Sequence, residues 1–491
     1  MSAWKCDVCG YVHQGGSAPD GCIICGADAE HFSLLTIIRA TEEKPAGDRW
    51  RCSICDHVET GAQPPQRCSI CGAAANLFEV VPDELTACGN TAIEKILILG
   101  GGVAGVTAAE EARKCSAKPS ITLISKEPGL PYYRLNLTRF LAGEVQEQEL
   151  PLKPANWFAE KNITLIEGEA LQIDRQKKQV LLRDGRGFSY DKLVLANGSH
   201  PFVPPIPGAT RDGVRTLRTL SDARQILEQL KTGLRVACIG GGLLGLETAG
   251  ALTRGGAKVT VFEGHPWLMP RQLPQQAAIL LQKQLEGMGI EVICGAQIQE
   301  LAGDEHLRSV LLADGREIPA ELAVISAGVR PNSCLARQAE LKVKSGLIVD
   351  DRMTTSDPDI LSAGDLTEHN GRLYGIWPAS YAQGVVAGIN AAGGTAEFPG
   401  LSLATRIKVV DVDLFSVGQL NLADASYRLV EKTVNDCYYG LVCRDNHLVG
   451  AALFGDTSLA AMLKEAIETE QQLQELPELL DRFPELVSIP A

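Results

Sequence analysis

Eight of the 15 cysteines lie in four Cys-x2-Cys pairs near the start of the chain. Two pairs separated by twelve residues form one set, and the same set recurs at an offset of 46 residues. Four thiolates brought together in this way are a tetrahedral ligand set for zinc or iron. We therefore predict two metal sites, with the ligands Cys6, Cys9, Cys22 and Cys25 in the first and Cys52, Cys55, Cys68 and Cys71 in the second.

The residues around these cysteines are duplicated as well, since Trp4 and Phe32 have counterparts in Trp50 and Phe78 at the same offset. Each unit is only about 35 residues long and cannot bury enough apolar surface to fold without a staple, which the metal would supply. We predict two small domains, at residues 1–38 and 48–83, joined by a polar segment that contains Pro45 and Gly47.

A glycine-rich turn that could bind a dinucleotide follows the duplicated region. The apolar run 96–99 leads into Gly100-Gly101-Gly102-Val103-Ala104-Gly105, then into a helical stretch at 106–113 and a second strand at 121–124 that ends beside Glu127. In this arrangement the glycines let the backbone approach the pyrophosphate, the helix N-terminus attracts its charge, and an acid binds the ribose.

The same arrangement recurs 140 residues later, where the strand 235–239 leads into Gly240-Gly241-Gly242-Leu243-Leu244-Gly245 and the strand 258–262 ends at Glu263. Glu263 would accept a hydrogen bond from a ribose 2′-hydroxyl and would repel a 2′-phosphate. We therefore predict two dinucleotide sites and favour NADH over NADPH at the second.

The elements that carry these turns are short β-branched runs alternating with alanine-rich helical stretches after Thr91, which is typical of α/β domains with parallel sheets. The 491 residues are enough for three or four domains. A formal net charge of −14 argues against nucleic acid or an anionic membrane as a partner. The chain has neither a run of 18 apolar residues nor an apolar N-terminal segment, so we expect a cytoplasmic protein whose grouped cysteines are ligands.

The stretch from Trp4 to Gly15 resembles the first knuckle of rubredoxins, particularly the rubredoxin-like domains attached to rubrerythrins. A glycine follows the second cysteine of each knuckle in the first copy, whereas Asp56-His57 replaces Gly10-Tyr11 in the second. Neither copy has the proline that usually follows the third cysteine of rubredoxins. The resemblance implies iron in both four-cysteine sites, and zinc remains the alternative.

From about Glu94 to its end, the chain resembles pyridine-nucleotide-dependent FAD reductases, close to the NADH:rubredoxin oxidoreductases and similar to the flavin portion of assimilatory nitrite reductases. This resemblance implies an FAD-binding domain at residues 94–210 and 323–400, with an NAD-binding domain at 211–322 inserted in it. Residues 401–491 would form an α+β interface domain, through which two chains could form a homodimer.

The resemblance also implies roles for single residues. The stretch 125–134 would supply the acid for the adenosine ribose, at the position of Lys126 or at Glu127, and Arg134 for the phosphates. Asp365 would hold the ribityl chain, and Gln383-Gly384 would belong to the helix over the flavin. The expected nucleotide-binding residues are Gly100, Gly102, Val103, Ala104, Gly105, Lys126, Glu127, Arg134, Arg139, Ala170, Ala196, Asn197, Gly198, Gly364, Asp365, Trp377, Gly240, Gly242, Leu243, Leu244, Gly245, Glu247, Glu263 and Gly328.

Some of these positions have a plainer interpretation. Trp377 could be a packing residue instead of a flavin contact, and Glu247 could lie on a solvated helix face. As catalytic residues, Arg139 would stabilise the charge of the reduced flavin and Glu247 would orient Arg139.

The chain lacks the Cys-x4-Cys pair of disulfide reductases after the first glycine turn, and it lacks the single cysteine that NADH oxidases and peroxidases carry near Leu137. Cys238 lies in an apolar strand and would be a small core residue. We expect the remaining seven cysteines to be unpaired: Cys88, Cys115, Cys238, Cys294, Cys334, Cys437 and Cys443.

These observations favour electron transfer from NADH through FAD to the two iron centres, each held by four cysteines, and on to an external protein. By analogy with related systems, that protein would be a rubrerythrin, a flavodiiron protein or a superoxide reductase in oxygen defence. Two alternatives stay open. The flavoprotein could serve a nitrite reductase-type module or oxygen, or the N-terminal units could be zinc ribbons that dock a partner.

Overall fold

Two three-stranded antiparallel sheets with the same strand order contain most of the described residues among the first 80. In the first sheet, β1 (Ala3–Cys6) lies between β2 (Val12–Gln14) and β3 (Phe32–Leu34). In the second, β4 (Arg49–Cys52) lies between β5 (Val58–Thr60) and β6 (Phe78–Val80). Cys6 pairs with Phe32 and Cys52 with Phe78, so the duplication extends to the strand register.

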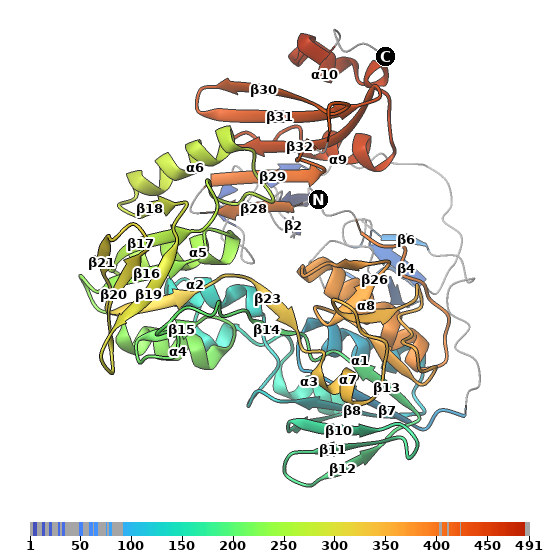
Figure 1. Cartoon of the computed structure of the whole chain (residues 1–491). Helices are drawn as coiled ribbons and strands as arrows, with labels where there is room; N and C mark the ends of the chain where they lie inside the picture. The colour runs from blue at the N-terminus through green and yellow to red at the C-terminus, as the bar shows by residue number, and fades with distance from the viewer. Residues whose placement is uncertain are drawn as a thin grey trace. The chain divides into compact units, whose positions relative to one another are not determined.

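The structure is a computed structural model that describes residues 3–6, 12–14, 19–21, 28–29, 32–34, 49–52, 58–61, 63–66, 75, 78–80, 92–401, 405–409, 412–422 and 424–486. The chain divides into two units, and Figure 1 labels the helices and strands along the chain. Unit 1 comprises Met1–Leu135, Glu147–His200 and Val329–Leu401, and unit 2 comprises Asn136–Gln146, Pro201–Gly328 and Ser402–Ala491.

Unit 1 is built on a five-stranded parallel sheet with the order β25-β13-β7-β8-β9. Its strands are β7 (Lys95–Leu99), β8 (Ser120–Ser125), β9 (Ile163–Glu167), β13 (Lys192–Leu195) and β25 (Ile360–Ser362). The central strands are apolar along their length because helices cover the sheet, as is usual for parallel sheets.

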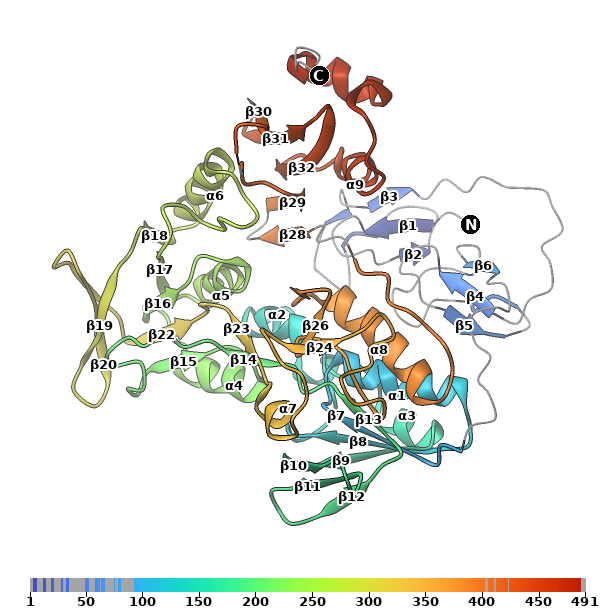
Figure 2. The same ribbon diagram turned by 45° about the vertical axis from the view of Figure 1, so that its right-hand side comes forward.

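Helices α1 (Val103–Cys115) and α8 (Trp377–Ala391) lie side by side in this unit (Figure 2). Their contact needs small residues: a Cβ on Gly384 would lie 2.6 Å from the Ala104 carbonyl oxygen, and one on Gly388 would lie 2.4 Å from that of Ala108. This close contact brings the start of α8 beside the first turns of α1, where the glycine-rich turn ends.

Smaller elements complete unit 1. A hairpin sheet consists of β10 (Ala170–Asp174), β11 (Gln179–Leu182) and β12 (Gly187–Ser189). The other strands and helices are α3 (Ala155–Glu160), β23 (Val329–Pro331), α7 (Cys334–Gln338), β24 (Leu347–Val349), β26 (Thr367–His369) and β27 (Arg372–Leu373). The short strand β14 (Ser199–Pro201) includes the last residues of one segment of unit 1 and the first residue of unit 2.

Unit 2 repeats this plan with the parallel order β15-β22-β16-β17-β18. Its strands are β15 (Val214–Thr216), β16 (Arg235–Ile239), β17 (Lys258–Glu263), β18 (Glu291–Cys294) and β22 (Leu322–Ile325). A second hairpin sheet consists of β19 (Ile298–Gly303), β20 (Leu307–Leu312) and β21 (Glu317–Pro319). The helices are α2 (Leu137–Leu141), α4 (Leu220–Gln229), α5 (Leu243–Arg254) and α6 (Gln275–Gly287).

The C-terminal part is an antiparallel sheet with the order β28-β29-β32-β31-β30. It contains β28 (Thr405–Val409), β29 (Val412–Gly418), β30 (Arg428–Val434), β31 (Cys437–Arg444) and β32 (His447–Phe454), followed by α9 (Ala460–Glu468) and α10 (Pro477–Arg482). The predicted fold class, two Rossmann-like domains with a C-terminal α+β part, is confirmed. Among the described residues, no helix combines the length and apolarity needed to cross a membrane.

The cysteines outside the repeat correct one prediction. Cys238, Cys294, Cys334, Cys437 and Cys443 are free thiols, and Cys238 is buried in β16 as expected for a core residue. Cys115, however, is disulfide-bonded, so the prediction that all seven are unpaired is wrong. Spacing along the chain does not show which thiols meet in space. Cys88 lies outside the described residues.

Candidate functional site

The first glycine turn can close only with glycine. Gly100 has a φ of +123°, and a Cβ there would lie 2.1 Å from the carbonyl oxygen of Ala196. A Cβ on Gly105 would lie 1.9 Å from the Gly100 carbonyl oxygen. Gly102 caps α1 without a side chain, and the space where its Cβ would lie is open. The backbone N–H groups of Val103 and its neighbours are therefore accessible to a phosphate.

Five buried polar atoms of unit 1 lack a hydrogen-bond partner among the described residues. Three of them belong to segments that the resemblance assigns to the flavin site: Oδ1 of Asn197, Nε1 of Trp377 and Nε2 of Gln383. Buried polar groups are normally paired, so these atoms indicate a ligand or water that would bond them. The neighbouring acid is already in place, because Asp365 accepts a hydrogen bond from the Ser199 hydroxyl at 2.8 Å.

Gly364 and Gly198 give the backbone beside Asp365 and Asn197 a positive φ. Gly364 has a φ of +85° and donates its N–H to Oε1 of Gln383 at 2.8 Å. Gly198, with a φ of +62°, follows the orphaned Asn197. The glycine cradle, the open helix terminus and the orphaned atoms together fit an elongated cofactor with phosphates and polar edges such as FAD.

Trp377 packs within unit 1 as the plainer interpretation predicts. Its ring stacks on Tyr381 with centroids 5.6 Å apart and on Tyr133 at 6.3 Å. The orphaned Nε1 is nevertheless a donor that packing alone does not use, so both interpretations of this residue stay compatible with the structure.

Glu127, Tyr132 and Arg134 form a closed group in unit 1. Nη2 of Arg134 lies 2.5 Å from Oε1 of Glu127, and the Tyr132 hydroxyl donates to Oε2 of the same carboxylate at 2.5 Å. Arg134 also donates to the Tyr132 hydroxyl at 3.0 Å. The guanidinium is thus oriented in advance for an anion, while both oxygens of the Glu127 carboxylate are engaged.

The second glycine turn in unit 2 repeats the geometry of the first. Gly240 has a φ of +116°, and its Cβ would lie 2.5 Å from the Ser326 carbonyl oxygen. A Cβ on Gly245 would lie 1.9 Å from the Gly240 carbonyl oxygen. Gly242 caps α5 without a side chain, and Leu243 and Leu244 open the helix.

The acid of the second turn is where the sequence predicts it. Glu263 ends β17 and is buried, with Oε2 accepting the Gly241 N–H at 2.7 Å and Oε1 accepting the His265 N–H at 2.7 Å. Gly328, with a φ of +105°, follows β22 at the same edge of the sheet. This carboxylate is held in a fixed orientation at the turn, as a ribose-binding acid requires.

The predicted pair of catalytic residues is arranged differently from the expectation. Arg139 donates Nε to Oε2 of Glu144 at 3.2 Å, and Oε1 of Glu144 lies 3.2 Å from Nη2 of Arg254. Glu247 instead accepts a hydrogen bond from the Thr138 hydroxyl at 3.2 Å. The direct Arg139–Glu247 pairing is therefore corrected: α2 presents Thr138 to Glu247, and Arg139 forms an ion pair with Glu144.

Burial raises the pKa of Glu247 to about 7, and the hydrogen bond from Thr138 acts in the opposite direction. This carboxyl therefore exchanges a proton near neutral pH. Thr138 and Glu144 were not found from the sequence, because a hydrogen-bonding threonine and a bridging glutamate carry no motif. The eight predicted metal ligands cannot be placed: the side chains of Cys6 and Cys52 and all of the other six residues lie outside the described part of the chain.

Comparison with known proteins is consistent with this geometry. A family model described as pyridine nucleotide-disulphide oxidoreductase matches residues 94–384. The rubredoxin NAD+ reductase C-terminal domain matches residues 404–471, and the rubrerythrin, rubredoxin-like domain matches residues 4–33 and 50–79.

Individual relatives agree with the family models. The chain is 31% identical to an NADH-rubredoxin oxidoreductase of Clostridium acetobutylicum over 387 residues, covering 78% of this chain and 97% of the relative. The crystal structure of NADH:rubredoxin oxidoreductase from that organism aligns with a TM-score of 0.70 and 30% identity, over 79% of this chain and 99% of the other.

The chain is also 36% identical to a nitrite reductase [NAD(P)H] of Bacillus subtilis over 386 residues, which cover 78% of this chain but 48% of the relative. It thus spans about half the length of the first curated relatives it matches. Because the family model covers more than half of the chain and the clostridial relative is covered almost completely, the chain belongs to the pyridine nucleotide-disulphide oxidoreductase family.

Proposed function

We propose that this protein is an NADH-dependent FAD oxidoreductase that passes electrons to its own rubredoxin-like centres and then to an external redox protein. One observation carries the proposal: two glycine turns with the same tight geometry lie in one chain, and only the second has a carboxylate, Glu263, at the strand end. An enzyme that transfers a hydride from one nucleotide to another must bind both nucleotides.

The residues of unit 1 would hold FAD, and those of unit 2 would hold NADH. The N-terminus of α1 and Arg134 provide positive potential for a pyrophosphate, and Asp365 would accept hydrogen bonds from hydroxyl groups of the ribityl chain. When bound, FAD supplies the chemistry of taking a hydride from NADH and releasing single electrons. Arg139 adds positive charge, and Glu247 holds a proton near neutral pH.

The duplicated N-terminal segment supports the same function. Only 14 residues separate Val80, the end of β6, from Lys95, the start of β7, a reach of at most about 50 Å. A tether of this kind raises the effective concentration of the second centre at the reductase without tight docking. Four thiolates suit either metal, and the resemblance to rubredoxins favours iron as a one-electron carrier, with zinc as the alternative that metal analysis decides.

The external acceptor would be a rubrerythrin, a flavodiiron protein or a superoxide reductase, as proposed from the resemblance. A net charge of −14 favours a partner with a basic patch and an association that weakens as salt increases. Cytoplasmic location and a homodimer remain part of this proposal.

The experiment is a metal, flavin and redox analysis of the purified protein. We expect about one FAD and two Fe per chain, with the iron absorbance bleached by NADH faster than turnover. The variants Cys9→Ser and Cys55→Ser should each lose one Fe. Two Zn per chain and no NADH-dependent iron signal would contradict the relay.

A second candidate function is a flavoprotein reductase for a nitrite reductase-type module or for oxygen, with zinc ribbons that dock a partner. The 36% identity to the Bacillus subtilis nitrite reductase favours it. It predicts NADH oxidation with artificial acceptors that is unaffected when all eight N-terminal cysteines are replaced by serine.

A further inference from the structure

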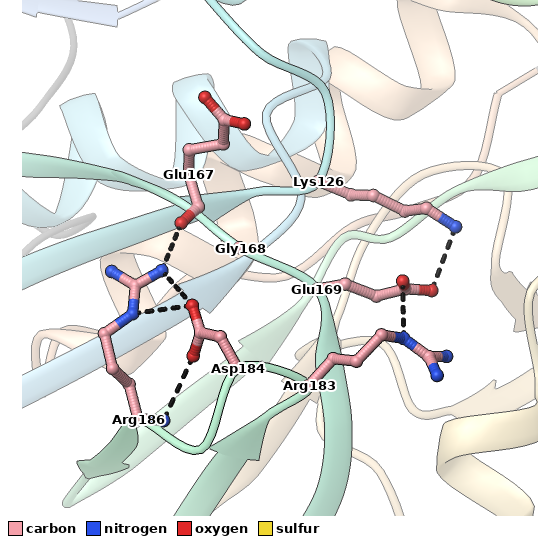
Figure 3. A pocket seen from close by; sticks show the side chains of 7 residues that line it. All are labelled: Lys126, Glu167, Gly168, Glu169, Arg183, Asp184 and Arg186. Carbon is pink, nitrogen blue, oxygen red and sulfur yellow. Dashed lines mark hydrogen bonds and ion pairs between the residues drawn. The ribbon is translucent and has the colours of Figure 1, made fainter.

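A hollow of about 470 Å³ opens in unit 1 outside the carboxyl ends of β8 and β9 (Figure 3). Lys126 follows β8, Glu169 lies two residues after β9, and Arg183 follows β11 on its rim. Ligands of open parallel sheets bind outside the carboxyl ends of the strands. The hollow is therefore on the side where the first nucleotide would extend beyond its pyrophosphate.

Glu169 is the centre of an ion-paired group in this hollow. Nζ of Lys126 lies 2.9 Å from one carboxylate oxygen of Glu169, and Nε of Arg183 lies 2.8 Å from the other. The hydrogen bonds from Lys126 and Arg183 lower the pKa of Glu169. Glu169 is 34% exposed, whereas Lys126 and Arg183 are 72% and 65% exposed, so the carboxylate is the recessed member of the group.

The two nucleotide-binding halves can be aligned through their backbone hydrogen bonds. The Gly168 N–H donates to the Ser125 carbonyl, and the Ala296 N–H donates to that of Glu263, each at 2.8 Å. Ser125 therefore occupies the position of Glu263. In agreement, a Cβ on Gly101 would meet Ser125, and one on Gly241 would meet Glu263.

The next hydrogen bond extends the alignment to the hollow. The Arg183 N–H donates to the Glu169 carbonyl at 2.8 Å, and the Ala313 N–H donates to the Gln297 carbonyl at 2.9 Å. Glu169 thus corresponds to Gln297, and Arg183 corresponds to Ala313. The half with a strand-end carboxylate has a neutral amide in the segment after the neighbouring strand, and the half without one has a carboxylate in that segment.

The other acids near the hollow do not face the ion-paired group. Glu127 does not line the hollow, and its carboxylate is bonded to Arg134 and Tyr132. Asp184 pairs with Arg186. Figure 3 shows the Glu167 carboxylate turned away from the ion-paired group.

We infer that Glu169, held by Lys126 and Arg183, is the carboxylate that binds the ribose hydroxyls of the adenosine end of the first nucleotide. It takes over at this site the role that the strand-end Glu263 has in the second half. This inference rests on the proposed function, in which the first site binds FAD. Ser125 is too short and uncharged for the role, and its hydroxyl already donates to the Glu127 carbonyl at 3.1 Å.

The test uses the full-length protein freed of flavin. Dissociation constants for FAD are measured by quenching of flavin fluorescence in wild type, Glu169→Gln and Asp314→Asn. A hydrogen bond to a charged group predicts FAD binding about tenfold weaker in Glu169→Gln. Asp314→Asn breaks a comparable surface ion pair with Arg316 in the other half and should leave FAD binding unchanged.

Competition with nucleotides assigns the contact to the ribose. Wild type should bind ADP more tightly than 2′-deoxy-ADP at the flavin site, and Glu169→Gln should bind both equally. If Glu169→Gln fails to fold, Lys126→Gln provides the second measurement, with FAD binding about two- to threefold weaker because the carboxylate loses one of its two cations.

The outcomes separate this inference from the proposed function. Wild type that binds no FAD would contradict the proposed function. Wild type that binds FAD, together with a Glu169→Gln variant of unchanged FAD affinity or unchanged preference for ADP over 2′-deoxy-ADP, would overturn the role of Glu169 alone.

Discussion

The hydroxyl of Thr138 donates a hydrogen bond to Oε2 of Glu247 across 3.2 Å, which joins α2 to the first turns of α5. Thr138 is buried, and the burial of Glu247 raises the pKa of its carboxyl to about 7. The hydrogen bond favours the ionised form and so moderates the rise. A group poised in this way changes its charge within the pH range in which an enzyme works.

Replacing Thr138 by valine should raise the pKa of Glu247 further, because the ionised carboxylate loses its donor. An infrared titration of the protonated carboxyl band, with Glu247→Gln to identify the band, measures the shift. We expect a midpoint near pH 7 in wild type and a higher one in Thr138→Val. A wild-type midpoint near 4.5, the ordinary value for glutamate, would contradict the burial argument.

The same group should make folding stability depend on pH. The pKa of Glu247 is higher in the folded state, so its contribution is fully present below the unfolded value near 4.5 and is lost as the pH rises through 7. The loss is at most about 3.5 kcal/mol, at about 1.4 kcal/mol per pKa unit. Urea unfolding at pH 5 and pH 8 should therefore show a smaller decrease in Glu247→Gln than in wild type. Equal decreases would show that Glu247 does not contribute.

Glu144 bridges two arginines, so its removal should affect both. Glu144→Gln removes one carboxylate partner from Arg139 and from Arg254, and we expect a loss of about 1 kcal/mol in the free energy of unfolding, since the pairs are partly exposed. A double-mutant cycle with Arg139→Gln isolates the pairwise energy. The exposed Asp304–Arg308 pair is the control and should give a smaller coupling. Equal couplings would mean that the Arg139–Glu144 contact is only a surface ion pair.

Replacing a glycine in one of the two turns should impair the binding of one nucleotide and leave the binding of the other unchanged. Gly100→Ala would drive a Cβ into the Ala196 carbonyl at a φ of +123° and should abolish FAD retention. Gly240→Ala, at a φ of +116°, should leave FAD in place and weaken NADH binding by more than about tenfold. Flavin content and NADH titration measure the two effects. Gly287→Ala, at the end of α6 with no atom within 4 Å of the added methyl, is the control that should change neither.

Glu263 should set the preference between NADH and NADPH. Its charge would repel a 2′-phosphate, so Glu263→Gln should narrow the ratio of kcat/KM values for NADH and NADPH by about tenfold or more. The amide oxygen can still accept the Gly241 N–H, which makes this variant milder than Glu263→Ala. An unchanged ratio would show that the selectivity comes from elsewhere in unit 2.

The sequence alone was sufficient for the features that depend on local spacing. Two glycine turns between a strand and a helix predict the Rossmann units, because only glycine permits the φ of Gly100 and Gly240 and the close approach at Gly105 and Gly245. The repeated cysteine pairs likewise predict the duplication, because the Cys-x2-Cys spacing is itself what a metal site with four thiolates requires.

Only the tertiary structure decided which side chains meet across elements. Arg139 and Glu247 were expected to pair. In the packing of α2 against α5, however, Thr138 donates a hydrogen bond to Glu247, and Arg139 forms an ion pair with Glu144. Glu169 lies between β9 and β10, whereas Ser125 ends β8, and only the backbone hydrogen bonds shared by the two halves relate the two positions. Such contacts depend on the angle and register at which separate elements pack, and the local sequence does not determine that angle or register.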